Sequence, residues 1–138
     1  MDLTLAILKP DCIRQKLTGK AIDFIESKGF KTLCMKKVKL DRPQAEAFYA
    51  VHKSKNFFND LILFMTSGPC IPMVLQKEEA VTEFREIMGA TDPKKAKDGT
   101  LRKLYADNVQ ENIIHGSDSM ENAKKEIAFF FPLTEIIS

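Results

Sequence analysis

The sequence contains no tryptophan and has only two histidines and three cysteines. Cys12, Cys34 and Cys70 lie far apart and form no Cys-x-x-Cys pair, which argues against a disulfide framework or a zinc site. We predict that they are small buried or half-buried residues of a protein in a reducing compartment. The two histidines are few enough to be assessed one at a time.

Several loops that usually bind phosphate are also missing. No Gly-x-x-x-x-Gly-Lys-Ser/Thr segment is present, which argues against a P-loop. No Gly-x-Gly-x-x-Gly segment follows an apolar run, which argues against a dinucleotide-binding fold and a protein-kinase loop. A phosphate-handling protein with this sequence would have to gather its cations from separate segments, with Lys9, Arg85 and Arg102 available.

Long apolar runs and an excess of one charge are absent too. The run Met1–Leu8 meets Lys9 at once and is too short for a signal-peptide core or a membrane span, so we expect a cytoplasmic protein without a membrane partner. The net charge of +2 does not indicate nucleic acid as a partner. With 44% hydrophobic residues, we expect one domain over residues 1–138.

Hydrophobic periodicity predicts strands and helices in turn along the chain. Strands are expected at 3–8, 32–40 and 70–75, and helices at 18–28, from 41 onward, at 57–65, 78–88 and 118–128. Residues 90–99 are expected to form a surface loop, and the run Phe129–Phe131 to close the sheet. This order favours an α+β fold with a small antiparallel or mixed sheet covered by helices, for which the ferredoxin-like pattern is the natural candidate.

The two histidines differ in their surroundings. His115 stands in the polar segment Asn112–Ser119, directly before a predicted helix, where the ring can be both exposed and held and where helix amides favour an anion. A capping turn with an incidental imidazole fits the same pattern, so local context leaves both interpretations open. His52 lies at helical spacing from Phe48 and Tyr49 and is more simply a partly buried helix residue.

The eight residues Asn112–Ser119 resemble the active-site signature of the nucleoside diphosphate kinase family. Other motifs of that family follow in the family's order along nearly the whole chain: Leu8–Asp11, Phe57–Phe58, Met65–Pro69, Met88–Pro93, Gly99–Arg102 and Lys125–Ile127. The resemblance implies a ferredoxin-like sandwich with a four-stranded antiparallel sheet. It also implies a ping-pong reaction, in which the terminal phosphate of a nucleoside triphosphate passes to a histidine and then to a nucleoside diphosphate.

The positions of these motifs imply which residues of this chain have catalytic and binding roles. His115 would be the nucleophile, which suits a neutral imidazole near pH 7, and Glu126 the carboxylate that orients its ring. Tyr49 matches a tyrosine beside that histidine, and Lys9 would act in catalysis as well as in binding. The nucleotide-binding residues implied by the resemblance are Lys9, Arg85, Thr91 and Arg102 for the phosphates, Lys9 and Asn112 for the sugar, and Phe57, Leu61 and Val109 for the base.

The resemblance further implies a cofactor and an assembly. Mg²⁺ would arrive with the nucleotide, held by phosphate oxygens and water, with no direct protein ligand and with Asp118 reaching it through water. Members of the family are built from dimers that join into tetramers or hexamers, and we expect this chain to follow them. The strand at 32–40 is the candidate sheet edge for such pairing.

Some positions depart from the family pattern. Lys103-Leu104-Tyr105 stands where Gly-Asp-Phe is common, Gln110-Glu111 where Gly-Arg is common, and Asn56 where proline is frequent. Losing two glycines changes local backbone freedom. One alternative is a nucleotide-binding regulatory module of the same fold with low turnover, against which the intact set His115, Glu126, Lys9, Arg85 and Arg102 argues. A nucleic-acid binder of similar shape is a second alternative, disfavoured by the low net charge and the lack of an aromatic ribonucleoprotein motif.

Overall fold

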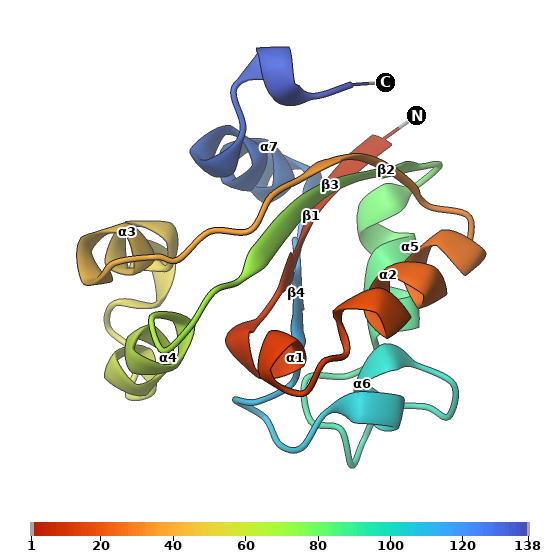
Figure 1. Ribbon diagram of the computed structural model, residues 1–138. Helices are drawn as coiled ribbons and strands as arrows, with labels where there is room; N and C mark the ends of the chain where they lie inside the picture. The colour runs from red at the N-terminus through yellow and green to blue at the C-terminus, as the bar shows by residue number, and fades with distance from the viewer. Residues whose placement is uncertain (1, 138) are drawn as a thin grey trace.

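The computed structural model describes residues 2–137 and contains one four-stranded antiparallel sheet (Figure 1). The strands are β1 (Asp2–Leu8), β2 (Lys31–Met35), β3 (Ile71–Lys77) and β4 (Ile114–Gly116), in the spatial order β2-β3-β1-β4. Every neighbouring pair is antiparallel. The predicted α+β ferredoxin-like architecture is confirmed, and β1, one of the two central strands, contains the first apolar run of the sequence.

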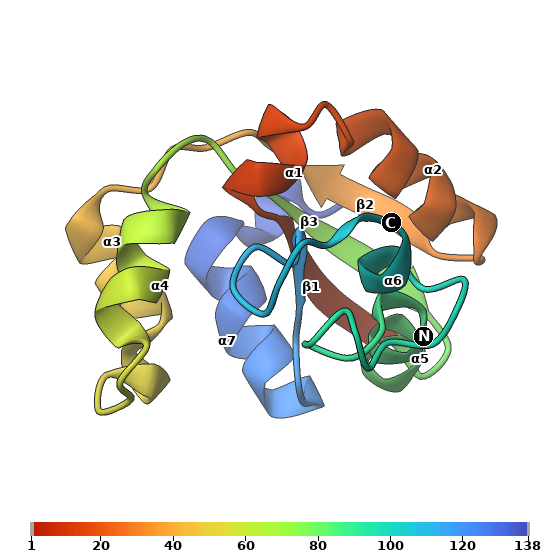
Figure 2. The same cartoon turned by 90° about the horizontal axis from the view of Figure 1, so that it is seen from below.

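Helices cover both faces of this sheet. They are α1 (Pro10–Arg14), α2 (Thr18–Ser27), α3 (Arg42–Phe48), α4 (Phe58–Met65), α5 (Ala80–Met88), α6 (Leu101–Tyr105) and α7 (Met120–Phe130), with 3₁₀ turns η1 (Ala50–His52) and η2 (Leu133–Glu135). Helices α2 and α5 lie on one face and α7 on the other, while α3 and α4 form a hairpin beside the end of the sheet (Figures 1 and 2).

Strand β1 is apolar from Leu5 to Leu8 because both of its faces are covered there. Leu5 and Ile7 belong to the hydrophobic cluster under α7 and the α3–α4 hairpin, whereas Ala6 and Leu8 belong to the cluster under α2 and α5. Successive side chains of a strand point to opposite faces, so a strand between two layers needs apolar residues at every position. Lys9 directly follows this strand and is thereby fixed at the edge of the core.

The sheet closes differently from the prediction. We expected Phe129–Phe131 to form the last strand, but Phe129 and Phe130 end α7 and the closing strand is β4. Ala123, Ile127 and Phe130 are buried at helical spacing, and this period outweighs the strand preference of three aromatic residues. His115 therefore lies in an edge strand, not in the polar turn that its sequence suggested.

Other boundaries also needed correction. The predicted strand at 32–40 ends at Met35 after a bulge between Thr32 and Cys34, and Val38 forms only an isolated bridge to Cys70. The helix predicted at 118–128 begins at Met120, because Ser119 caps it by accepting from the backbone N–H of Asn122. The five-residue helices α1 and α6 were not predicted, because they are too short for a periodic signal.

The three cysteines are free, as predicted, with Cys12 and Cys70 buried and Cys34 half-buried. Burial raises the pKa of the Cys12 thiol to about 12 and that of Cys70 to about 11, so both stay protonated near neutral pH. Among residues 2–137, no helix combines the length and the apolar character that crossing a membrane requires.

Candidate active site

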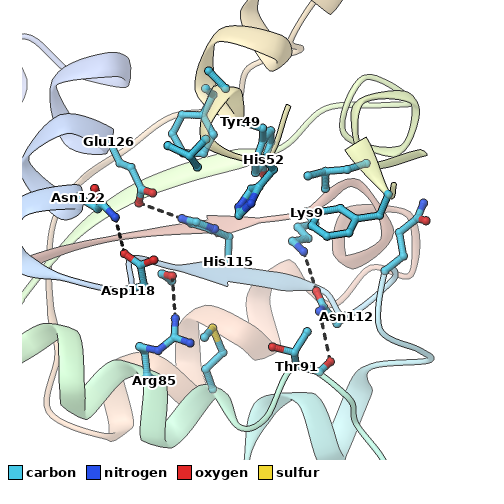
Figure 3. Close-up of a pocket in the computed structure, with 18 of the residues that line it drawn as sticks. Lys9, Tyr49, His52, Arg85, Thr91, Asn112, His115, Asp118, Asn122 and Glu126 are labelled. Atoms are coloured by element: carbon cyan, nitrogen blue, oxygen red, sulfur yellow. Dashed lines mark hydrogen bonds and ion pairs between the residues drawn. The ribbon is translucent and has the colours of Figure 1, made fainter. Parts of the chain in front are cut away.

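A cavity of about 700 Å³ opens between the α3–α4 hairpin, helices α5 and α7, and the chain that leads into β4 (Figure 3). Every site residue that the sequence predicted lines it: Lys9, Tyr49, Phe57, Leu61, Arg85, Thr91, Arg102, Val109, Asn112, His115, Asp118 and Glu126. The volume lies within the usual range for small-molecule sites, about 300–1,000 Å³. The fold thus brings together residues from widely separated parts of the chain, from Lys9 to Glu126.

His115 is held on the cavity wall by a chain of hydrogen bonds. On β4 it pairs with Ile7, and its neighbours Ile114 and Gly116 are buried, so that its ring points into the cavity. The ring Nε2 lies 2.9 Å from Oε1 of Glu126, which also accepts a 2.7 Å bond from the Ser117 hydroxyl. A carboxylate at Nε2 favours the tautomer with its proton on that nitrogen.

Ser117 in turn connects this pair to the central strand. The backbone N–H of Leu5 donates to the Ser117 hydroxyl over 3.2 Å. The Glu126 carboxylate is therefore positioned from β1 as well as from its own helix α7. Ser117 was not predicted as a site residue, although it belongs to the signature segment and lies two residues after the histidine.

Two aromatic rings pack edge-on against the imidazole. The ring centroid of Phe48 lies 5.7 Å from that of His115, and the centroid of Tyr49 lies 6.5 Å away. The Tyr49 hydroxyl is buried and has no hydrogen-bond partner among the described residues. Burial raises the pKa of Tyr49 far above its ordinary value, so the hydroxyl stays neutral. Phe48, which the sequence did not single out, completes the apolar wall behind the histidine.

Three cations gather on the opposite side of the cavity. Lys9 is 8% exposed, and its Nζ donates a 2.7 Å bond to Oδ1 of Asn112. Burial, and after it the charge of Arg102, lowers the pKa of Lys9 to about 7. Burial, and after it the charge of Arg85, lowers the pKa of Arg102 to about 10. Buried positive charges that depress each other's pKa values form a site for an anion.

The backbone before β4 is strained, and it carries the polar groups of the site. Ile113 has φ +64°, which is unfavourable for a β-branched residue. The carboxylate of Asp11 accepts from its N–H over 3.1 Å, and the N–H of Lys9 donates to its carbonyl over 2.8 Å. Asn112 beside it is buried and donates to the carbonyl of Val109. The strained turn thus fixes Asn112 and the entry into β4, and the sequence did not reveal it.

The outer end of the cavity is apolar and open. Phe57 at the start of α4 is 50% exposed, and Val109 is 55% exposed. The His52 ring lies 5.6 Å from the Phe57 ring, in η1 rather than in a continuous helix. An exposed phenyl ring at the mouth of a cationic cavity is suited to stacking on a flat ligand.

A comparison with known proteins agrees with this geometry. The family model "Nucleoside diphosphate kinase" matches residues 2–136. The chain belongs to the nucleoside diphosphate kinase family. It is 56% identical over 137 residues to the nucleoside diphosphate kinase of Chlorobaculum tepidum, covering 99% of this chain and 98% of that one. It is 55% identical over 138 residues to that of Chloroherpeton thalassium, covering 100% and 98%.

Solved structures of the nucleoside diphosphate kinase family share the fold. The enzyme of Aquifex aeolicus matches with a TM-score of 0.96 and 37% identity, covering 99% of both chains. The enzyme of Halobacterium salinarum, solved in complex with CDP, matches with a TM-score of 0.95 and 37% identity, covering 99% of this chain and 91% of that one.

The two glycines missing from the family pattern are accommodated without strain. Lys103 lies in helix α6 with an exposed side chain, and Gln110 is exposed in the segment before Asn112. The non-glycine residues with positive φ among those described are Lys16, Glu79 and Ile113, so neither position requires glycine. The departures therefore leave the backbone of this family member intact.

Proposed function

We propose that the protein transfers the terminal phosphate of a nucleoside triphosphate to a nucleoside diphosphate, with His115 as the covalent carrier. The observation that carries this proposal is the His115–Glu126 pair, 2.9 Å apart, in a cavity that also holds Lys9, Arg85 and Arg102. A neutral imidazole with one nitrogen bound to a carboxylate has a lone pair on the other, and opposite it lies a site for polyphosphate. The family to which the chain belongs supports the same reaction.

The contact between Glu126 and Nε2 determines which nitrogen of the His115 ring reacts. Because Nε2 is engaged by Glu126, the lone pair of Nδ1 attacks the terminal phosphorus, and the bond from that phosphorus to the bridging oxygen breaks. The bridging oxygen leaves with the electron pair as part of the diphosphate. Glu126 stabilises the positive charge that the ring acquires, in the manner of other carboxylate–histidine pairs. A second diphosphate reverses the steps, and its terminal oxygen takes the phosphate from Nδ1.

The three cations stabilise the charge on the transferred group and the leaving diphosphate. A bound polyphosphate would raise the pKa of Lys9 again, since a nearby opposite charge favours the protonated amine. Thr91 lies on the same side and adds a hydroxyl donor. Lys9 and Asn112, already joined by a hydrogen bond, are placed to bind the sugar hydroxyls between the phosphates and the base.

The residues of this cavity would bind magnesium only together with the phosphates of a nucleotide. Among residues 2–137, no group of three or more His, Cys, Asp or Glu side chains could hold a metal ion. Asp118 is one carboxylate on the cavity wall, and a hydrogen bond from Asn122 lowers its pKa, so it is ionised near neutral pH. Asp118 would hold the ion through water, while the ion neutralises phosphate charge.

The test of the function has two steps. The purified protein is incubated with γ-labelled ATP, freed of nucleotide, and then given a different nucleoside diphosphate. We expect label on the protein after the first step and a labelled triphosphate after the second. A protein that keeps its label, or never takes it, would instead be the nucleotide-binding regulatory module, which the comparisons do not favour.

The open phenyl ring of Phe57 provides a second prediction. Phe57→Ala should weaken nucleotide binding by about 1–3 kcal/mol, the usual size of a base–aromatic stack. The loss should be similar for purines and pyrimidines, since every base has a π-face. Binding measured by calorimetry with ADP and CDP would check this; the CDP complex of the Halobacterium salinarum enzyme supports a pyrimidine ligand. A loss confined to one base would point to hydrogen-bond readout instead.

We also infer that the protein works as a dimer-based homo-oligomer in the cytoplasm, with residues 1–138 as one domain. Strand β2 is at one edge of the sheet, where pairing with a second copy would satisfy its free backbone groups. The free cysteines fit a reducing compartment. If folding is coupled to association, the unfolding midpoint should rise with protein concentration. Light scattering over a dilution series would check this, and an active monomer at every concentration would contradict it.

A further inference from the structure

Two parts of the chain that lie far apart in sequence form the walls at the outer end of the cavity. The α3–α4 hairpin carries Phe57 and Leu61 and stands beside the end of the sheet (Figures 1 and 2). The opposite wall is the segment 107–112, which carries Val109 and Asn112. A ligand between these walls stays bound only as long as they remain together. What joins them therefore affects nucleotide release.

Gln110 bridges the two walls directly. Its side-chain Nε2 donates to the backbone carbonyl of Asp60, in the first turn of α4, over 3.3 Å. Asp60 lies next to Leu61 and three residues after Phe57, so the bond reaches the part of the hairpin that lines the cavity. Gln110 itself lines the cavity beside Val109. A glycine at this position could not make this bond, because it has no side-chain donor.

Glu111 reaches the same helix through Arg14. The Glu111 carboxylate lies 3.5 Å from Nη2 of Arg14, whose Nη1 donates to the Ser67 hydroxyl over 3.1 Å. Ser67 follows the C-terminal end of α4, and the Arg14 guanidinium lies over the ring of Phe64 in that helix. An arginine at position 111 would place a second positive charge against Arg14.

The backbone of segment 107–112 forms a turn that lets the Gln110 and Glu111 side chains reach toward helix α4. The Asn108 side chain accepts from the backbone N–H groups of Gln110 and Glu111 over 3.0 and 2.8 Å. The carbonyl of Glu111 accepts from the N–H of Asp107 over 3.1 Å. These local bonds close a tight turn, which reduces the conformational freedom that the two bridging contacts must overcome.

We propose that Gln110 and Glu111 form a clasp that holds the Val109–Asn112 segment against helix α4 and slows the release of the nucleotide base. The inference rests on the proposed function for the identity of the ligand. Both contacts are exposed to solvent. The Glu111–Arg14 pair contributes modestly, whereas the Gln110 bond joins the two walls where Gln110 lines the cavity. Both residues are positioning residues, because they act through Phe57, Leu61 and Val109.

The main test removes the Gln110 donor without changing charge or side-chain length. In Gln110→Met, a fluorescent ADP analogue chased by excess ADP should dissociate about two- to tenfold faster than from the wild type, the range expected for one hydrogen bond. Inorganic tripolyphosphate occupies the phosphate positions without a base, so its inhibition constant should be unchanged. Gln15→Met, at an exposed glutamine that does not line the cavity, serves as the matched control. Gln110→Ala repeats the test if the methionine variant does not fold.

The ion pair is tested by charge exchange. Arg14→Glu and Glu111→Arg should each speed dissociation, and the double variant, with the same net charge as the wild type, should return toward the wild-type rate. Unchanged dissociation in Gln110→Met, or an equal change for tripolyphosphate, would overturn the clasp. If the wild type binds the analogue but transfers no phosphate, the proposed function fails, while the dissociation rates still decide the clasp.

Discussion

His115→Ala is expected to remove both the phosphate label and the turnover of the protein. A methyl group cannot form the covalent intermediate, so the transfer rate should fall by about three orders of magnitude or more. The label that γ-labelled ATP leaves on the wild type should survive alkali and be lost in acid, as a phosphoimidazole requires. More than a trace of label on the alanine variant would show that another group carries the phosphate.

The structure offers a matched control for this experiment. His52, the only other histidine, lines the same cavity, but its ring packs on Phe57 rather than beside the cations. His52→Ala should be labelled at a rate near that of the wild type, with at most a weaker affinity for the base. The His115 ring is partly exposed, with 19% of its side-chain area accessible, so His115→Ala should keep its fold by circular dichroism.

Much of the site could be predicted because its residues fall in motifs of fixed order. The predicted base, sugar and phosphate residues lie on separate elements, yet all line one cavity. What the motifs could not indicate is how the side chains hold each other. Ser117 reaches both Leu5 and Glu126 only because β4 pairs with β1, and that pairing joins residues more than one hundred positions apart.

The errors in the predicted fold have two physical causes. A strand of three residues is too short to show alternation, so β4 could be recognised only from its partner β1. The run Phe129–Phe131 has the composition of a strand, but the buried period of α7 runs through it. The strain at Ile113 leaves no trace in composition, because it depends on the Asp11 carboxylate that holds the backbone.

Arg102→Ala is expected to lower both stability and the rate of phosphate transfer. Arg102 is 5% exposed, and its guanidinium donates to the carbonyls of Gly89, Asn112 and Ile114 over 3.2, 3.4 and 2.7 Å. Leaving buried carbonyls unpaired costs about 1–3 kcal/mol each, less what water can satisfy. We expect the free energy of unfolding to fall by roughly 2–4 kcal/mol, measured by urea denaturation.

The same change should slow transfer, because Arg102 holds the backbone on both sides of Ile113 and adds charge to the phosphate site. Single-turnover labelling of His115 should slow by about a hundredfold or more in Arg102→Ala. Arg102→Lys keeps a positive charge but cannot reach three carbonyls at once, so its stability and rate should both lie in between. Lys103→Ala, at the exposed neighbour on α6, should match the wild type. Wild-type stability in Arg102→Ala would mean that the three carbonyls do not depend on this side chain, and its effect on rate would then come from charge alone.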